Sequence, residues 1–293
     1  LYERREDYRE GTVPEGGLLL TAGVDIQKDR IEVSIWAWGR DKESWLVEHR
    51  VIDGDTSRAD VWDKLTGMLS ETWSHASGVQ MPLKRLAVDS GYATQEVYGW
   101  ARRQHAGLVM AVKGVERGAA LVGMPSAVDI TAAGKRLRRG VKIRSVAGGI
   151  AKLELFNNLR KERPTDEELA AGEAYPAGYV HLPKVDSEYC KQLCSEHLVT
   201  TKNRRGYAVR EWRKLRERNE ALDCYVYARA AAAVVGLDRF EERHWRKLAD
   251  SLGGDPAPRA KKQRTSESKA SSSRPASGRR GDWLGDRRGN WLK

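Results

Sequence analysis

The chain has 293 residues, of which 40% are hydrophobic and 32% are charged, and its formal net charge is +11. This basic excess favours a polyanionic partner, with nucleic acid ahead of an anionic membrane surface. No apolar run approaches the roughly 20 residues that span a bilayer, and no secretory signal pattern opens the chain, so we expect no membrane partner. Three irregularly spaced cysteines suit a reducing compartment. Because the first residue is Leu rather than Met, we expect a part of a longer protein.

The first half of the chain predicts a sheet. Residues 1–17 are charged and lack periodicity, and we expect an N-terminal arm or a linker remnant. Residues 18–26 form a short apolar run that is typical of a buried central strand. After a polar turn, Ile31, Val33 and Ile35 alternate with other residues and predict a second strand. Residues 43–51 alternate in the same way and predict a third.

Helices then alternate with strands. Thr56 or Ser57 is expected to cap a helix that carries apolar residues at helical spacing from 59 to 69. Residues 84–89 predict a fourth, buried strand, Thr94 begins a second helix, and residues 108–112 predict a fifth strand. Three meandering strands followed by helical crossovers give a mixed α/β sheet, for which we predict the order 3-2-1-4-5.

The second half is less regular. Residues 115–183 are interpreted as a β-rich insertion, with short apolar alternations at 141–146 and 151–156. Residues 187–197 resemble a helix, 198–201 and 207–212 a hairpin, and 217–235 a long Ala-rich helix. We divide the chain into the arm (1–17), one globular α/β domain (18–240) and a basic tail (241–293). From about residue 253 that tail is rich in Ser, Arg and Lys and is expected to be disordered.

Three acidic residues interrupt otherwise apolar elements. Asp25 lies in the first strand, Asp89 closes the fourth, and Asp223 lies in the last helix. In the predicted order the first and fourth strands are neighbours, so Asp25 and Asp89 can meet at one sheet edge, and the last helix can bring Asp223 there. Converging carboxylates repel one another unless cations neutralise them, and Mg²⁺ prefers such oxygen ligands. Two such ions about 3.5–4 Å apart promote phosphodiester cleavage.

Each acid also has a structural explanation. Asp25 and Asp89 can cap turns, and Asp223 can be a solvated helix position. For each acid taken alone, the structural explanation is preferable. The three acids together, in this order and on these elements, favour a metal site.

The segments around these acids resemble a known family. TAGVDIQKDRIEVSIWAWG, LAVDSGYAT, Val112-Lys113-Gly114 and NEALDCYVYARAA together look like the nuclease half of the large terminase subunit of lambda-type tailed phages, the GpA family. The resemblance implies an RNase H-like fold and a divalent-metal endonuclease that cuts concatemeric phage DNA during packaging in the host cell cytoplasm. It implies Asp25, Asp89 and Asp223 as catalytic metal ligands, binding Mg or Mn, two ions per site.

The resemblance also implies partners. These are double-stranded DNA, the small terminase subunit, an ATPase motor and the portal of the capsid. No G-x-x-x-x-G-K-[ST] loop occurs in the sequence, so the motor is expected upstream or on another chain. The tail ends in two Trp-Leu pairs, which we interpret as portal-docking anchors, with stacking on DNA bases as the alternative. They are Trp283, Leu284, Trp291 and Leu292.

Several basic residues are candidates for phosphate contacts. Lys113 ends the fifth strand, and it either meets a phosphate near the metals or is a solvated strand-end lysine. The others lie in two basic clusters, which are alternatively plain solvated surface: Lys135, Arg136, Arg138, Arg139, Arg204 and Arg205.

Two further alternatives remain open at this point. Cys190, Cys194 and His197 share a predicted helix face, and Cys224 is a possible fourth zinc ligand, but inward-packed cysteines explain the spacing as well. For the whole chain, the alternatives are another RNase H-like nuclease, such as a resolvase or transposase, and a non-catalytic DNA-binding packaging protein.

Overall fold

A computed structural model describes residues 1–128 and 141–254 of the chain. The predicted contacts at Lys135–Arg139 and the four tail anchors lie outside these residues. In the described parts no helix is long and apolar enough to cross a membrane.

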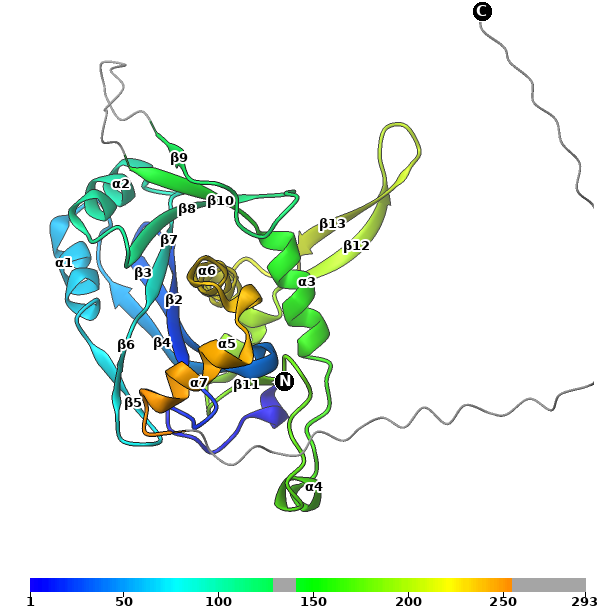
Figure 1. Cartoon of the computed structure of the whole chain (residues 1–293). Coiled ribbons are helices and arrows are strands. Elements are labelled where there is room, and N and C mark those ends of the chain that lie inside the picture. The colour runs from blue at the N-terminus through cyan, green and yellow to red at the C-terminus, as the bar shows by residue number, and fades with distance from the viewer. Residues whose placement is uncertain (129–140, 255–293) are drawn as a thin grey trace, which may run out of the picture. The chain divides into compact units, whose positions relative to one another are not determined.

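The centre of the fold is an eight-stranded mixed sheet in the order β11-β4-β3-β2-β7-β8-β10-β9 (Figure 1). Its strands, in chain order, are β2 (Leu19–Ile26), β3 (Arg30–Trp38), β4 (Ser44–Asp53), β7 (Arg85–Asp89), β8 (Val109–Val115), β9 (Ser126–Ala127), β10 (Lys142–Ala147) and β11 (Val180–His181). β2, β3 and β4 are antiparallel, whereas β7 runs parallel to β2, and β8 parallel to β7. The five predicted strands are β2, β3, β4, β7 and β8, so their predicted order is confirmed.

Two smaller sheets accompany it. One contains β1 (Thr12–Val13), β5 (Thr72–His75) and β6 (Gln80–Pro82), and the other is the hairpin β12 (Glu196–Lys202) and β13 (Ala208–Lys214). The hairpin projects from the body of the domain in Figure 1.

Helices cover both faces of the main sheet (Figure 1). They are α1 (Ala59–Met68), α2 (Thr94–Arg103), α3 (Gly148–Asn158), α4 (Asp166–Ala170), α5 (Ser187–Leu193), α6 (Glu220–Val235) and α7 (Glu242–Asp250), with short 3-10 turns at Tyr2–Arg4, Arg40–Lys42 and Leu237–Arg239. On one side Trp62 of α1 and Trp100 of α2 pack with ring centroids 5.8 Å apart. On the other side Tyr225 of α6 meets Trp36 edge-on at 4.9 Å. β2 is buried along its whole length, because both of its faces are covered.

Several sequence predictions need correction. The apolar alternation at 151–156 belongs to helix α3, where the buried residues are Ala151, Leu155 and Asn158, at helical rather than strand spacing. α1 has Arg58 at its N-cap position with no side-chain cap, and the hydroxyl of Thr56 instead donates to the Gln27 carbonyl at 2.8 Å. The helix expected over 187–197 ends at Leu193.

Both ends of the described chain pack against the domain. Residues 1–17 contribute β1, and the Tyr8 hydroxyl donates to the Leu46 carbonyl at 2.8 Å. His181 is 2% exposed and lies between two carboxylates, 2.8 Å from Glu6 and 2.7 Å from Glu43. α7 lies in the stretch expected as tail and buries Trp245 in the core. Residues 1–17 therefore pack as part of the domain, and the domain continues beyond residue 240 into the stretch expected as tail.

Candidate active site

Helix α6 lies directly on strand β2. Thr21, Gly23 and Asp25 alternate onto the face of β2 that meets the helix. The Thr21 hydroxyl donates to the Ala228 carbonyl at 2.8 Å, and a Cβ on Gly23 would lie 1.9 Å from the carbonyl oxygen of Cys224. Only a glycine permits this approach, which brings the first turn of α6, with Asp223, beside the end of β2.

Asp25 is almost completely buried at this junction. Asp25 is 6% exposed, and its Oδ2 accepts a hydrogen bond from the side-chain amide of Gln27 at 2.6 Å. Burial raises the pKa of Asp25 well above its usual range, and the negative charges of Asp223 and Asp89 raise it further. The negative charges of both other predicted acids therefore act on Asp25.

Asp89 ends β7, next to β2. Burial raises its pKa, although the Tyr227 hydroxyl and the backbone N–H groups of Gly91 and Ser90 donate to it. A Cβ on Gly91 would come within 2.9 Å of Oδ2, so a larger residue there would displace the end of the Asp89 side chain. Oδ1 is buried and has no hydrogen-bond partner in the described residues. A buried, unsatisfied carboxylate oxygen is costly unless something binds it.

Asp223 lies in the first turn of α6, with its side chain 26% exposed. Its Oδ2 accepts a hydrogen bond from the Asn219 amide at 2.7 Å, and its Oδ1 lies 3.8 Å from the ammonium of Lys152. Burial raises the pKa of Asp223 to about 6, with Glu196 and Asp89 contributing and Lys152 opposing the shift. We call Asp25, Asp89 and Asp223 the carboxylate triad.

The surroundings of the triad contain charged residues that sequence reasoning missed. Glu196, at the base of the hairpin, is 5% exposed, and both of its oxygens lie 2.8 Å from Lys152 Nζ. Lys152 lies in a segment expected to be a strand, and Glu196 in one expected to be a helix, so no periodicity marked them. Tyr227, in the quoted NEALDCYVYARAA segment, also went unnoticed.

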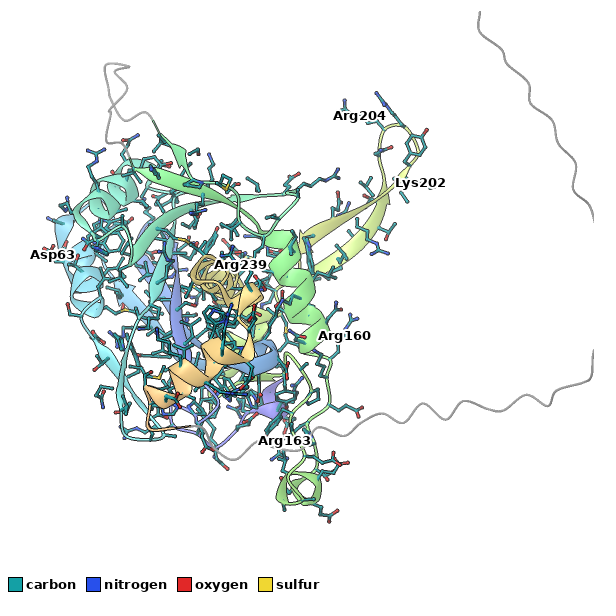
Figure 2. The ribbon with its side chains drawn as sticks, in the orientation of Figure 1. Asp63, Arg160, Arg163, Lys202, Arg204 and Arg239 are labelled. Atoms are coloured by element: carbon teal, nitrogen blue, oxygen red, sulfur yellow. The ribbon has the colours of Figure 1, made fainter. Side chains whose placement is uncertain are left out.

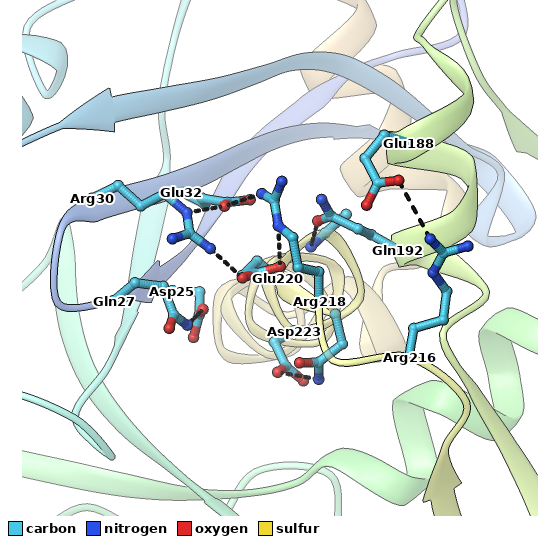
Figure 3. Close-up of polar contacts among 12 residues, drawn as sticks. Asp25, Gln27, Arg30, Glu32, Glu188, Gln192, Arg216, Arg218, Glu220 and Asp223 are labelled. Carbon is cyan, nitrogen blue, oxygen red and sulfur yellow. Dashed lines mark hydrogen bonds and ion pairs between the residues drawn. The ribbon is translucent and has the colours of Figure 1, made fainter.

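A second ionic cluster lies beside Asp25. Glu32, directly across the strand pair from Asp25, is fully buried. It accepts hydrogen bonds from Arg30 at 2.7 Å and Arg218 at 2.8 Å, and Arg30 also pairs with Glu220 (Figure 3). Burial opposes ionisation of Glu32, but its contacts with His49 and Arg30 lower its pKa to about 2. This cluster holds the start of β3 against the start of α6.

The predicted phosphate contacts fall in different places. Lys113 is exposed on β8 and directly follows Val112, the residue that pairs with Asp89, and its positive charge lowers the pKa of Asp89. Arg204 and Arg205 are exposed in the turn of the hairpin, and Figure 2 shows Arg204 and Lys202 at its tip. The structure therefore brings Lys113 to the acids and leaves the hairpin arginines on a separate projection.

The cysteine constellation does not form. His197 belongs to strand β12, not to the helix that carries Cys190, and the three cysteines are unbonded thiols. Cys190 and Cys224 are buried, as small apolar side chains commonly are.

The triad has the chemistry of a hard-cation site. Within residues 1–128 and 141–254, no three His, Cys, Asp or Glu side chains are already drawn together around a single metal position. The donor set is nevertheless all-oxygen, mutually repulsive and short of one partner at Asp89. Such carboxylates suit Mg²⁺ or Mn²⁺.

Comparison of the chain with known protein families finds a match. The model of the terminase large subunit gpA endonuclease domain matches residues 1–245. The chain belongs to this family. The match begins at the first residue and therefore includes the segment that we expected to be an arm.

Two curated relatives of this family member are phage proteins. The terminase large subunit of Escherichia phage lambda is 30% identical over 236 residues, covering 79% of this chain and 34% of that protein. The corresponding protein of Enterobacteria phage P21 is 32% identical over 225 residues, covering 76% and 33%. The chain thus spans about a third of the length of these relatives.

Two solved structures are also similar. The large terminase nuclease from thermophilic phage G20c aligns with a TM-score of 0.35 and 12% identity, over 77% of this chain and 85% of that one. The g2p (large terminase) nuclease domain from bacteriophage SPP1, a structure with bound Mn, aligns with a TM-score of 0.34 and 10% identity, over 78% and 96%.

Proposed function

We propose that this endonuclease-domain family member cleaves double-stranded DNA with the help of divalent cations, and that it cuts concatemeric viral DNA into genome units. The observation that carries the proposal is the carboxylate triad: three acids that the parallel pairing of β2 with β7 and the close approach of α6 bring to one end of the sheet, where Asp89 and Asp223 raise the pKa of Asp25. A solvated or merely turn-capping acid has no reason to be held in that way.

Asp25, Asp89 and Asp223 would hold the cations, either Mg²⁺ or Mn²⁺ and two per site. When bound, such ions supply an activated water and charge stabilisation for the leaving oxygen. Asp25 and Asp223 would release the amides of Gln27 and Asn219, which now occupy one oxygen of each. The Asp89 Oδ1 atom needs no such exchange, because it has no hydrogen-bond partner in the described residues.

Basic residues near the triad would position the DNA. Lys113 is exposed beside Asp89, so its ammonium can contact the scissile phosphate or a neighbouring one. Arg204 and Arg205 on the projecting hairpin would grip the backbone farther away. Lys135, Arg136, Arg138 and Arg139 remain candidates for the same role outside the described residues.

The remaining partners are proposals for the longer protein. We propose an upstream ATPase motor, the small terminase subunit and the capsid portal, with Trp283-Leu284 and Trp291-Leu292 as the portal anchors, all in the host cytoplasm. Deleting residues 282–293 should abolish portal binding and leave cleavage intact. Unchanged portal binding would remove the anchors from this role.

A plasmid-cleavage assay tests the nuclease proposal. Supercoiled DNA is incubated with the chain in Mg²⁺ or Mn²⁺, and with Asp25→Asn, Asp89→Asn and Asp223→Asn separately. Each triad variant should lose cleavage by at least about a hundredfold while keeping its circular dichroism spectrum. Asp63→Asn, an exposed residue of α1, serves as the matched control and should remain active.

The assay also separates the alternatives. A non-catalytic packaging protein would bind the plasmid and never cut it. A resolvase-like nuclease would prefer branched DNA, so equal cleavage of linear duplexes and four-way junctions would argue against that class. Full activity in any one triad variant would remove that residue from the site.

A further inference from the structure

A buried ion pair lies immediately behind the carboxylate triad. Lys152 of α3 donates to both oxygens of Glu196, at 2.8 Å each, and the two side chains are only 13% and 5% exposed. The next acid along is Asp223, whose Oδ1 lies 3.8 Å from the same ammonium. We call Lys152 and Glu196 the tether pair. One lysine is thus shared unequally between two acids, and the acid outside the triad holds it.

Asn219 and Lys214 connect the tether pair and Asp223 in one hydrogen-bond network. The side-chain amide of Asn219 donates to Asp223 Oδ2 at 2.7 Å and to Glu196 at 3.3 Å, and Lys214 donates to the side-chain oxygen Oδ1 of Asn219 at 2.7 Å. Glu196 and Lys214 are opposed across the base of the hairpin, so their backbones are fixed by strand pairing. Glu196 therefore cannot swing away easily, whereas the long Lys152 side chain can pivot.

Movement of the Lys152 ammonium toward Asp223 would affect the binding of any cation at the triad. If Glu196 did not hold Lys152, its ammonium would meet Asp223 directly, as the nearest remaining carboxylate. An ammonium bound to Asp223 would neutralise the charge that a divalent ion needs and occupy one of its oxygens. The tether pair removes this internal competitor without removing the lysine.

We propose that Glu196 is a positioning residue that holds Lys152 out of direct hydrogen-bond contact with Asp223 and so sets the affinity of the carboxylate triad for divalent cations. The proposal rests on the triad being the cation site of the proposed function. Glu196 acts here through Lys152 and not as a metal ligand. Its charge and that of Lys152 cancel, so the tether pair adds no net charge to the site.

Mn²⁺ binding to the full chain tests the proposal, with free Mn²⁺ measured by electron paramagnetic resonance and no DNA present. The variants are Glu196→Gln, Lys152→Met and the double variant. Glu196→Gln should weaken Mn²⁺ binding by about tenfold, because the charge of Lys152 would no longer be offset by Glu196 and its ammonium could close from 3.8 Å to direct hydrogen-bond contact with Asp223. Lys152→Met should not weaken it.

The double variant decides the mechanism. If Glu196 acts through Lys152, replacing Glu196 in the Lys152→Met background should cost much less affinity than in the wild-type chain. A loss as large or larger in that background would overturn the proposal, because Glu196 would then act as a ligand or as a plain negative charge. Should Glu196→Gln fold poorly, Lys152→Met alone still tests it: a tenfold weaker affinity in that variant would contradict the proposal. Lys184→Met, an exposed lysine paired with Asp7, is the control and should bind as wild type does.

The variant Asp25→Asn distinguishes a failure of the Glu196 proposal from a failure of the triad as the cation site. Loss of Mn²⁺ binding in Asp25→Asn, together with unchanged affinity in Glu196→Gln, would reject the tether pair and keep the triad as the cation site. Absence of Mn²⁺ binding to the wild-type chain, or binding that is unaltered in Asp25→Asn, would reject both.

Discussion

The surroundings of Asp223 disfavour its ionised form, so the folded protein is destabilised when Asp223 is ionised at neutral pH. Its pKa in the folded chain is about 6, above the ordinary 3.8, chiefly because it is buried. A raised carboxyl pKa means that the folded state binds the proton more tightly than the unfolded state. The resulting stabilisation is complete below about pH 4 and is lost as the pH rises through about 6. At neutral pH the cation-free triad therefore weakens the fold.

Asp223→Asn should consequently stabilise the cation-free protein at pH 8. We expect a gain of about 2 kcal/mol in the free energy of unfolding, which falls to about half of that at pH 5 and vanishes only below about pH 4, where Asp223 is protonated in the folded and the unfolded state alike. Urea unfolding in EDTA at both pH values measures it. A variant that is less stable than wild type at pH 8 would show that Asp223 is held by favourable contacts instead. Asp63→Asn, on the exposed face of α1, should change stability by less than about 0.5 kcal/mol.

Lys113 should contribute more to cleavage than to DNA binding. An exposed lysine beside Asp89 contributes one charge to overall DNA affinity, but a larger share to the charge that develops at the cleaved phosphate. Lys113→Ala should slow cleavage by about a hundredfold and weaken DNA binding by less than about tenfold. Single-turnover cleavage and filter binding measure the two quantities. Lys142→Ala, another exposed lysine of the sheet, should alter neither strongly, and equal losses for Lys113→Ala would indicate a general electrostatic role.

At the scale of elements, the approach of α6 to β2 builds the site. The helix contributes Asp223 and Tyr227, and the strand contributes Asp25, and the two meet because residue 23 is glycine. Without that contact, the acids would have no common edge.

Gly23→Ala should therefore be among the most damaging single changes in the domain. Its Cβ would lie 1.9 Å from the Cys224 carbonyl oxygen, and backbone cannot move aside as a flexible side chain can. We expect a loss of more than about 4 kcal/mol, or no soluble folded protein. Gly67→Ala in α1 is the matched control, because a Cβ there meets nothing within 4 Å, and it should be neutral or stabilising. Thermal unfolding compares them, and equal melting temperatures would contradict the close packing.

Sequence reasoning reached the strands and the acids for one physical reason. A central strand buried on both faces is a continuous apolar run, so a charge within it, such as Asp25, stands out. Helix α3 was missed because six residues of mixed apolar and charged type satisfy strand and helix spacing equally well. Lys152 and Glu196 were missed with it, since a pair 44 positions apart becomes visible only when the helix and the hairpin are placed. The carboxylate triad was thus predictable, and its electrostatic surroundings were not.

At the scale of the whole molecule, the net charge of +11 governs encounters with DNA. Described basic side chains gather on the projecting hairpin, whose tip carries Lys202, Arg204 and Arg205 (Figure 2). A sequence-independent grip on phosphates releases counterions, so affinity should fall steeply with salt.

Replacing both Arg204 and Arg205 by Ala should reduce the slope of log affinity against log salt by about 2. Fluorescence anisotropy with two unrelated duplexes measures this slope and tests sequence preference at once. Arg163→Ala, away from the hairpin, should leave the slope nearly unchanged. An unaltered slope in the double variant, or strong preference for one duplex, would show that the hairpin does not grip the backbone.

The central claim is that Asp25, Asp89 and Asp223 together hold divalent cations. Anomalous scattering from crystals soaked in Mn²⁺ tests it most directly, because the signal locates the ions themselves. Two peaks should appear about 3.5–4 Å apart, each within ordinary ligand distance of triad oxygens, with Asp89 Oδ1 engaged. Anomalous peaks elsewhere on the chain with none at the triad, or a fully soaked crystal without any peak, would contradict it.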